Sequence, residues 1–135
     1  MNYQIVILEK KIQPDYKKAM NEYLKRLSKY CTINVAVVKK EVQAKKFIQR
    51  SGRHIWVTEG KETIESTVFA ENIEDASIHG ISNMTFYIGA FEEEKIKEEC
   101  FYLSSFSMTE DLKATILLEQ IYRSYRIIHH QAYHK

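Results

Sequence analysis

The chain has 135 residues, of which 44% are hydrophobic and 28% charged, and its formal net charge is +2. This length fits one domain with its own core, and this composition excludes disordered and collagen-like chains. Only four glycines are present, none of them in a G-x-G-x-x-G pattern, and Gly60-Lys61 lacks the upstream glycine of a P-loop. A Rossmann dinucleotide site and a P-loop NTPase are therefore excluded.

Cysteine usage and the amino-terminal segment bear on the compartment. Cys31 and Cys100 lie far apart without C-x-x-C partners, which is too few for a disulfide framework or a zinc knuckle. The opening MNYQIVILEKK lacks the features of a signal peptide, and no apolar run reaches the roughly 18–20 residues of a membrane span. His130 and His134 have no acidic third ligand nearby in the sequence. We therefore expect a cytoplasmic protein without metal or membrane association.

Charge is distributed unevenly along the chain. Residues 1–53 carry 13 lysines and arginines against 4 acidic residues, whereas residues 54–111 carry 3 against 13 and residues 112–135 carry 4 against 1. A basic surface can attract the phosphate backbone of a nucleic acid. It is equally compatible with a solvated helix surface in a protein whose acidic residues lie elsewhere. Charge alone leaves both interpretations open.

The first half of the chain alternates between strand and helix signals. Gln4–Leu8 is a short apolar run rich in β-branched residues, which predicts a buried strand. Residues 14–30 begin with a proline and have apolar side chains at helical spacing, which predicts an amphipathic helix. Thr32–Val38 predicts a second buried strand, and residues 39–50 show weak helical periodicity. Arg53–Thr58 predicts a third strand that ends at a Glu-Gly turn.

The alternation continues in the second half. Glu65–His79 has helical periodicity and precedes a glycine, as helix ends often do. Met84–Ile88 predicts a fourth strand, Glu92–Cys100 a short and very acidic helix, and Phe101–Phe106 a fifth strand. A long final helix over residues 109–128 starts with a threonine cap and two acidic residues, which suit the helix dipole.

Strands that alternate with helices and are apolar on both faces indicate a mainly parallel sheet. We therefore predict a single α/β domain over residues 1–135, with five to six strands and helices on both faces of the sheet. Ligands of such folds bind at the carboxyl ends of the strands. The sequence thus directs attention to the residues that follow Thr58, Ile88 and Phe106.

Several segments resemble motifs of one family. The final helix contains LLEQIYRSYR, and the chain closes on QAYHK. Further matching segments are AMNEYLKRLSKY at 19–30, the Gly-Lys pair at 60–61, TFYIG at 85–89 and LSSFSMT at 103–109. Together they resemble the RlmH family of ribosomal large-subunit pseudouridine N3-methyltransferases, which belongs to the SPOUT class. The resemblance extends over nearly the whole chain, and its closing motif is specific.

This resemblance implies a fold, a cofactor and a partner. SPOUT-type proteins are α/β domains with a C-terminal trefoil knot, they bind S-adenosylmethionine in the knot, and they work as homodimers. The resemblance therefore implies a single SPOUT-like methyltransferase domain over residues 1–135. Its implied activity is S-adenosylmethionine-dependent methylation of pseudouridine N3 in large-subunit (23S) rRNA, with the ribosome as partner. Composition and periodicity alone indicate no knot.

The family match also implies a cofactor site built from loops at strand ends. The matching positions are Val57, Gly89, Leu103, Ser104, Ser105, Phe106, Ser107 and Met108. Gly89, which has no Cβ, suits a close approach of the backbone to a ligand. An ordinary strand-end turn at this glycine, and a strand end followed by a helix cap at the serines, are the alternatives.

The catalytic and RNA-binding residues follow from the same resemblance. Tyr133 and His134 match the terminal residues that approach the cofactor and the target base; His134 could assist proton removal, and Tyr133 could hold the base. A frayed tail is the alternative. Arg123, Arg126 and Lys113 would supply phosphate contacts or structural pairing, and Glu119 is a possible ion-pair partner for Arg123.

Other segments depart from the family pattern. Gly89 is the only glycine of its loop and is followed by Ala90-Phe91 and three glutamates, and the region between the second and third strands is short. These departures lie close to the implied cofactor site. They leave open an alternative function, a catalytically impaired SPOUT-fold homodimer that binds RNA or protein.

Overall fold

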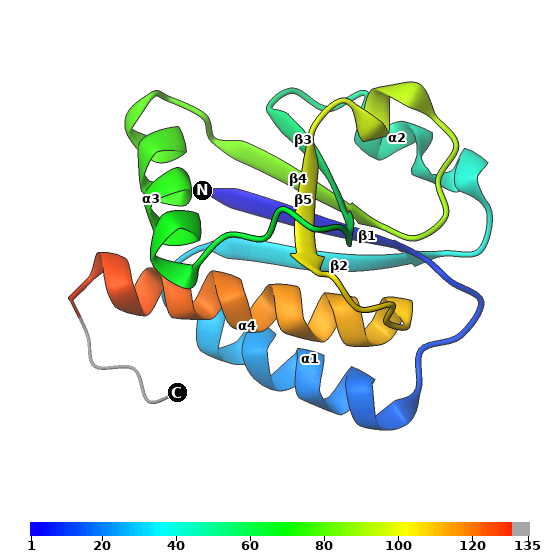
Figure 1. Cartoon of the computed structure of the whole chain (residues 1–135), viewed down its shortest axis with the longest axis horizontal. Coiled ribbons are helices and arrows are strands. Elements are labelled where there is room, and N and C mark those ends of the chain that lie inside the picture. Colours follow the sequence, from blue (N-terminus) through cyan, green and yellow to red (C-terminus); the bar gives the residue numbers. More distant parts are fainter. Residues whose placement is uncertain (131–135) are drawn as a thin grey trace.

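A computed structural model describes residues 1–130 and contains one five-stranded sheet in which all strands are parallel (Figure 1). The strand order across the sheet is β2-β1-β4-β3-β5. The strands are β1 (Asn2–Leu8), β2 (Thr32–Val38), β3 (Arg53–Glu59), β4 (Asn83–Ile88) and β5 (Cys100–Ser104). The prediction of a parallel α/β domain with five to six strands is confirmed.

Helices lie on both faces of the sheet, as predicted, but the two layers differ in size. The long helices share one face: α1 (Pro14–Leu27), α3 (Ser66–Ile78) and α4 (Glu110–Ile128). The other face is covered only by short elements: η1 (Glu41–Ala44), α2 (Lys45–Ile48) and η2 (Glu94–Lys97). In Figure 1, α1 and α4 run side by side on one side of the sheet, and α2 lies on the opposite side.

The core divides along the alternation of side chains in the strands. Ile5 and Ile7 of β1 point to the long helices and pack in the larger cluster with Leu117 and Leu118 of α4. Val6 points to the other face and joins the smaller cluster around α2 and η2. Because helices or turns cover both faces of this parallel sheet, successive side chains of a central strand are buried on alternate faces, and the strand sequences are almost continuously apolar.

The element boundaries agree with the sequence prediction within two residues except in α1, which ends at Leu27 rather than Tyr30, and in the acidic segment. The acidic segment forms only the 3-10 turn η2; Phe91 and Ile96 anchor it to the sheet, and its glutamates are exposed except Glu99, which is half-buried. The fifth strand ends at Ser104 rather than Phe106. Periodicity did not indicate this end, since Phe106 is apolar yet lies on the surface.

The cap of the final helix is another difference. Thr109 occupies the N-cap position of α4, but its hydroxyl makes no cap hydrogen bond and instead donates to Asp111 Oδ1 at 2.6 Å. None of the helices within residues 1–130 has the length and apolar content needed to cross a membrane. The trefoil knot stays a prediction.

Candidate functional site

The structure brings the described strand-end residues of the implied cofactor site together at one edge of the sheet. Val57 of β3 is paired with Ile88, the residue before Gly89, and with Phe101 of β5. Two residues further along β3, Glu59 is paired with Ser104, and the Gly60 N–H donates to the Ser104 carbonyl at 3.0 Å. The carboxyl ends of three neighbouring strands thus meet, as is typical of ligand sites in parallel sheets.

Gly89 has a backbone conformation that favours glycine. Its φ is +131°, and a Cβ placed on it would lie 2.8 Å from Leu8 Cβ and 2.9 Å from the Leu8 carbonyl oxygen. Its own carbonyl accepts a hydrogen bond from the Trp56 indole at 3.0 Å. The close approach that this glycine permits is therefore to β1. The alternative of a strand-end turn accounts for these contacts, and a contact with the cofactor stays a prediction.

The segment Ser105–Met108 follows β5, lies outside the sheet and presents a mixed polar and aromatic surface. Ser105 and Ser107 are exposed, and the Phe106 side chain is 78% exposed. The Phe106 N–H donates to Ser104 Oγ at 3.1 Å, which turns the chain immediately after β5. Three consecutive exposed residues therefore offer an apolar ring and two hydroxyl groups to the solvent.

An ion pair beneath this segment joins three parts of the chain. Glu59 Oε1, at the end of β3, accepts the Met108 N–H at 3.2 Å and lies 2.8 Å from Lys113 Nζ. The hydrogen bond from Lys113 lowers the pKa of Glu59, so its carboxylate is charged near neutrality. Glu59 therefore fixes Met108 relative to the strand end. The sequence assigned it no role, and its only signal was its place directly after a predicted strand.

A second carboxylate anchors the start of α4. Asp111 Oδ2 accepts the Gln13 N–H at 3.1 Å, just before α1, while Oδ1 accepts the Thr109 hydroxyl. Burial acts to raise the pKa of Asp111, but these hydrogen bonds and the Leu112 N–H outweigh it and lower that pKa. Burial also raises the pKa of neighbouring Glu110. Through Asp111, the first turn of α4 is thus bonded both to the residue before α1 and to its own N-cap residue, Thr109.

The three implied phosphate-binding residues lie along α4. Lys113 is buried, and its ammonium is paired with Glu59 at 2.8 Å and with Glu110 at 3.5 Å. Arg123 forms the ion pair with Glu119 that the sequence had left open, at 2.7 Å. Structural pairing, the alternative role, therefore accounts for both side chains. Arg126 is half-buried on the last turn.

The implied catalytic residues Tyr133 and His134 lie outside the described residues, so their roles stay predictions. Within residues 1–130, no group of three or more His, Cys, Asp or Glu side chains is arranged to hold a metal ion. Burial raises the pKa of the Cys31 thiol to about 11. This thiol is therefore protonated near neutrality, as expected of an unreactive cysteine.

The backbone of the acidic run after Gly89 is held by a side chain from another element. The Glu41 carboxylate, at the start of η1, accepts the N–H groups of both Glu92 and Glu93 at 2.8 Å. Buried Phe91 and Ile96 flank this contact. One acidic side chain thereby fixes the backbone of an acidic loop whose own carboxylates are exposed.

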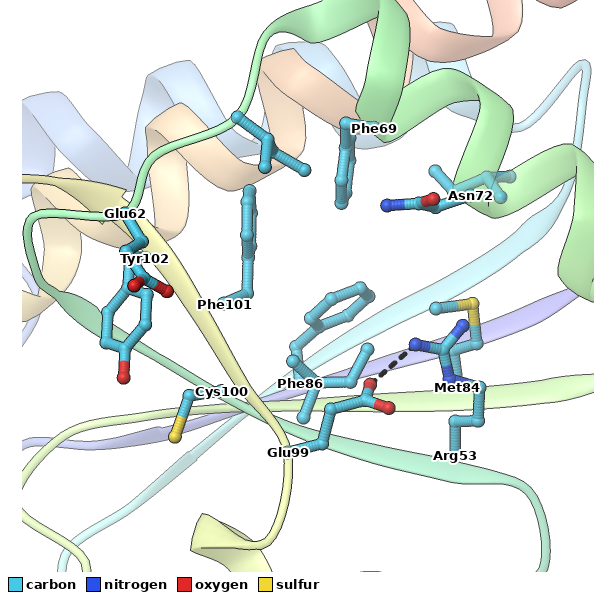
Figure 2. Close-up of a pocket in the computed structure, with 13 residues that line it drawn as sticks. Arg53, Glu62, Phe69, Asn72, Met84, Phe86, Glu99, Cys100, Phe101 and Tyr102 are labelled. Carbon is cyan, nitrogen blue, oxygen red and sulfur yellow. Dashed lines mark hydrogen bonds and ion pairs between the residues drawn. The ribbon is translucent and has the colours of Figure 1, made fainter.

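A separate hollow of about 390 Å³ lies between α3 and the β3–β5 edge (Figure 2). The Phe69 and Phe101 rings stack within it at 4.8 Å, and the Arg53–Glu99 ion pair, 2.6 Å long, lies at its side. None of the implied cofactor residues lines it. This hollow is therefore distinct from the strand-end site.

The fold is that of an α/β protein with a parallel sheet, and the described residues of the implied cofactor site lie at the carboxyl ends of its strands. Residues 1–134 match the model of the family described as "Predicted SPOUT methyltransferase". The chain belongs to the SPOUT methyltransferase family. Membership implies a methyl-donor cofactor.

Relatives with similar sequences carry names of one kind. The chain is 31% identical to "Ribosomal RNA large subunit methyltransferase H 1" of Thermoanaerobacter sp. (strain X514) over 135 positions, which cover the whole of both chains. It is 36% identical to "Putative ribosomal RNA large subunit methyltransferase H" of Methanococcus vannielii over 160 positions, and 33% identical to "Ribosomal RNA large subunit methyltransferase H 1" of Clostridium perfringens (strain SM101 / Type A) over 159, again covering all of each chain. The latter two contain segments that this chain lacks.

Proposed function

We propose that this chain is an S-adenosylmethionine-dependent methyltransferase of large-subunit (23S) rRNA that acts on N3 of a pseudouridine, in the cytoplasm and as a homodimer. The observation that carries the proposal is the end-to-end similarity to relatives named as large-subunit rRNA methyltransferases. One of them aligns over 135 positions without excess length, so the short form of this chain is compatible with that name.

The strand-end segment has the chemistry that S-adenosylmethionine requires. Adenine needs apolar surface and hydrogen-bonding groups at its edge, and the exposed Phe106 is flanked in the sequence by the exposed Ser105 and Ser107. Backbone groups of Leu103–Met108 would hold the adenosine, and Val57 would contribute only its backbone, because its side chain is fully buried in the core. When bound, the cofactor supplies an electrophilic methyl group on its sulfonium.

The residues of this chain would position the base and remove a proton. Pseudouridine N3 carries a proton that must leave when the nitrogen is methylated. A histidine titrates near neutrality, so His134 would accept that proton, and Tyr133 would hold the base. Positioning two bound reactants supplies most of the rate enhancement that such a transfer needs.

Titration calorimetry with S-adenosylmethionine, followed by a methylation assay on ribosomes that lack the modification, tests this function. We expect cofactor binding, methyl transfer to large-subunit rRNA, and a light-scattering mass of twice 16.0 kDa. His134→Ala or deletion of Tyr133–Lys135 should abolish transfer and leave the dimer intact. A folded dimer that binds no cofactor at millimolar concentration would refute the enzyme and favour the alternative of a non-catalytic SPOUT-fold homodimer that binds RNA or protein.

A further inference from the structure

The sheet face covered by η1, α2 and η2 is apolar over only half of its length. Near the amino ends of the strands, one row of side chains crosses this face from strand to strand. Its members are paired in register: Asn34 with Gln4, Gln4 with Thr85, and Thr85 with His54. Parallel sheets normally bury apolar side chains on both faces, so a polar row is unusual.

A second polar row lies beside the first, at the amino-terminal end. Asn2 is paired with Thr32 on one side and with Asn83 on the other. The two rows border an open hollow of about 440 Å³, whose floor includes Gln4 and Thr85, only 8% and 2% exposed. Among the described residues that line this hollow are four side-chain amides, and no carboxylate is one of them.

The polar groups of this hollow are held in place. Gln4 Nε2 donates to the Ile5 carbonyl at 3.1 Å, and Asn2 Nδ2 donates to Asn83 Oδ1 at 3.3 Å. Arg50 Nη1 approaches Gln4 Oε1 at 3.5 Å, so the guanidinium lies at the edge of the hollow. Fixed donors and acceptors lose little conformational entropy when they bind a ligand.

Arg50 lines the hollow, and a second cation, Lys46, contacts the same aromatic ring as Arg50 does. The Arg50 guanidinium lies 4.9 Å and the Lys46 ammonium 5.1 Å from the centre of the Phe47 ring, so both cations gather around one aromatic side chain. Both residues are exposed and belong to the strongly basic stretch 1–53. Cations beside a polar, acid-free hollow suit phosphates linked to groups that form hydrogen bonds.

We propose that this polar hollow, with Arg50 at its rim and Lys46 beside the same Phe47 ring, is a second RNA contact, which binds an unpaired stretch of rRNA away from the methylated nucleotide. The inference rests on the proposed function, which makes RNA the substrate. Amide side chains form hydrogen bonds with the edges of unstacked bases, and the two cations contact phosphates. Strands of six to seven residues separate this hollow from the strand-end site by about 20 Å, so the two sites contact different nucleotides.

A protein partner suits the hollow less well. Specific protein interfaces bury a largely apolar centre. The exposed groups here are two asparagines, a threonine, a serine and an arginine, while the apolar lining residues Tyr3 and Met84 are 2% and 3% exposed. The accessible surface therefore matches a nucleic acid better than an apolar peptide.

Co-sedimentation of the full-length protein with purified large ribosomal subunits, between 50 and 200 mM KCl, tests the proposal. Arg50→Ala should weaken binding about five- to twentyfold and reduce the slope of log affinity against log salt by about one, as the loss of one phosphate contact does. Asn34→Asp, a negative charge on an exposed edge-strand position, should weaken binding at least tenfold. The matched control is Arg26→Ala, an exposed arginine on α1, at the opposite face, which should bind within twofold of wild type.

Calorimetry with S-adenosylmethionine on the same variants separates this proposal from the proposed function. Each variant should bind the cofactor as wild type does, which also shows that it is folded. Unchanged subunit affinity in both Arg50→Ala and Asn34→Asp would overturn the RNA contact and leave the methyltransferase proposal intact. If Arg50→Ala weakens binding but leaves the salt slope unchanged, Arg50 contacts a ribosomal protein and not an RNA phosphate. That result would also overturn the RNA contact. The predicted subunit effects without any cofactor binding would refute the enzyme alone.

Discussion

A single carboxylate oxygen, Glu59 Oε1, accepts hydrogen bonds from both the Lys113 ammonium at 2.8 Å and the Met108 N–H at 3.2 Å. The end of β3, the segment before α4 and the first turn of α4 therefore meet at one atom. Because Lys113 is buried, its charge depends on this carboxylate and on Glu110 for compensation. The pair links the stability of the domain to the geometry of the proposed cofactor segment.

Replacement of Glu59 by glutamine should weaken both stability and cofactor binding. The neutral side chain leaves the buried Lys113 with only the longer contact to Glu110, so we expect a loss of about 2 kcal/mol in the free energy of unfolding. Met108 also loses a charged acceptor, and the affinity for S-adenosylmethionine should fall about tenfold. Urea denaturation and calorimetry measure the two effects.

The double variant Glu59→Gln with Lys113→Met serves as control for the charge. It removes the uncompensated cation, so it should recover part of the lost stability and little of the cofactor affinity. Equal cofactor affinity in wild type and Glu59→Gln would show that the pair plays no part in positioning the segment.

The stability of the domain should fall on acidification below about pH 4.5. The pKa values of Glu59 and Asp111 are lowered in the folded state, so the folded protein binds protons at these carboxylates less tightly than the unfolded chain does. Their stabilisation is complete above the unfolded pKa values, roughly 4, and is lost as the pH falls through the folded values. The raised pKa of Glu110 acts in the opposite sense and offsets part of this loss.

Urea midpoints at pH 7 and pH 3 measure this dependence. Glu59→Gln should lose less stability over this range than wild type, because one of the two lowered carboxyls is absent. An identical loss in the two proteins would show that Glu59 does not contribute to the acid sensitivity.

Much of the fold could be predicted because helical and strand periodicities are local properties. The apolar runs Gln4–Leu8 and Met84–Ile88 identified strands of the observed sheet within one or two residues. The end of β5 could not be predicted in this way, since the hydrophobicity of Phe106 suggests burial and its position on the surface follows from the turn after Ser104. Strand order likewise depends on contacts distant in sequence.

The candidate site was only partly predictable for the same reason. The family resemblance identified the strand-end positions, and the structure brings the described ones together. It did not identify Glu59 or the contact between Gly89 and Leu8, because both depend on side chains from separate elements. For Lys113 the resemblance implied a phosphate contact or structural pairing, and spacing alone could not distinguish a phosphate ligand from a buried ion-pair partner.

Gly89→Ala should destabilise the domain and impair the strand-end site. The backbone has a φ of +131°, and the added Cβ would lie 2.9 Å from the Leu8 carbonyl oxygen, which belongs to a central strand and cannot move freely. We expect a loss of about 3 kcal/mol in the free energy of unfolding, together with weaker cofactor binding.

Gly80→Ala is a matched control for backbone strain. Gly80 also has a positive φ, +82°, but no atom lies within 4 Å of its added Cβ. We expect a loss of about 1 kcal/mol and unchanged cofactor binding. Equal losses in the two variants, measured by urea denaturation, would show that the contact with Leu8 adds nothing to the strain of the backbone.

Phe106→Ala should separate function from stability at the proposed cofactor segment. A side chain that is 78% exposed contributes little to folding, so the free energy of unfolding should change by less than about 0.5 kcal/mol. The loss of the only aromatic surface of Ser104–Met108 should nevertheless weaken S-adenosylmethionine binding at least tenfold in calorimetry, because an adenine ring would lose its apolar contact. Ile78→Ala, at a side chain 72% exposed on α3, is the control and should alter neither quantity. If Phe106→Ala binds the cofactor as tightly as wild type does, the adenine lies against other residues, and the assignment of Phe106 to the cofactor site is wrong.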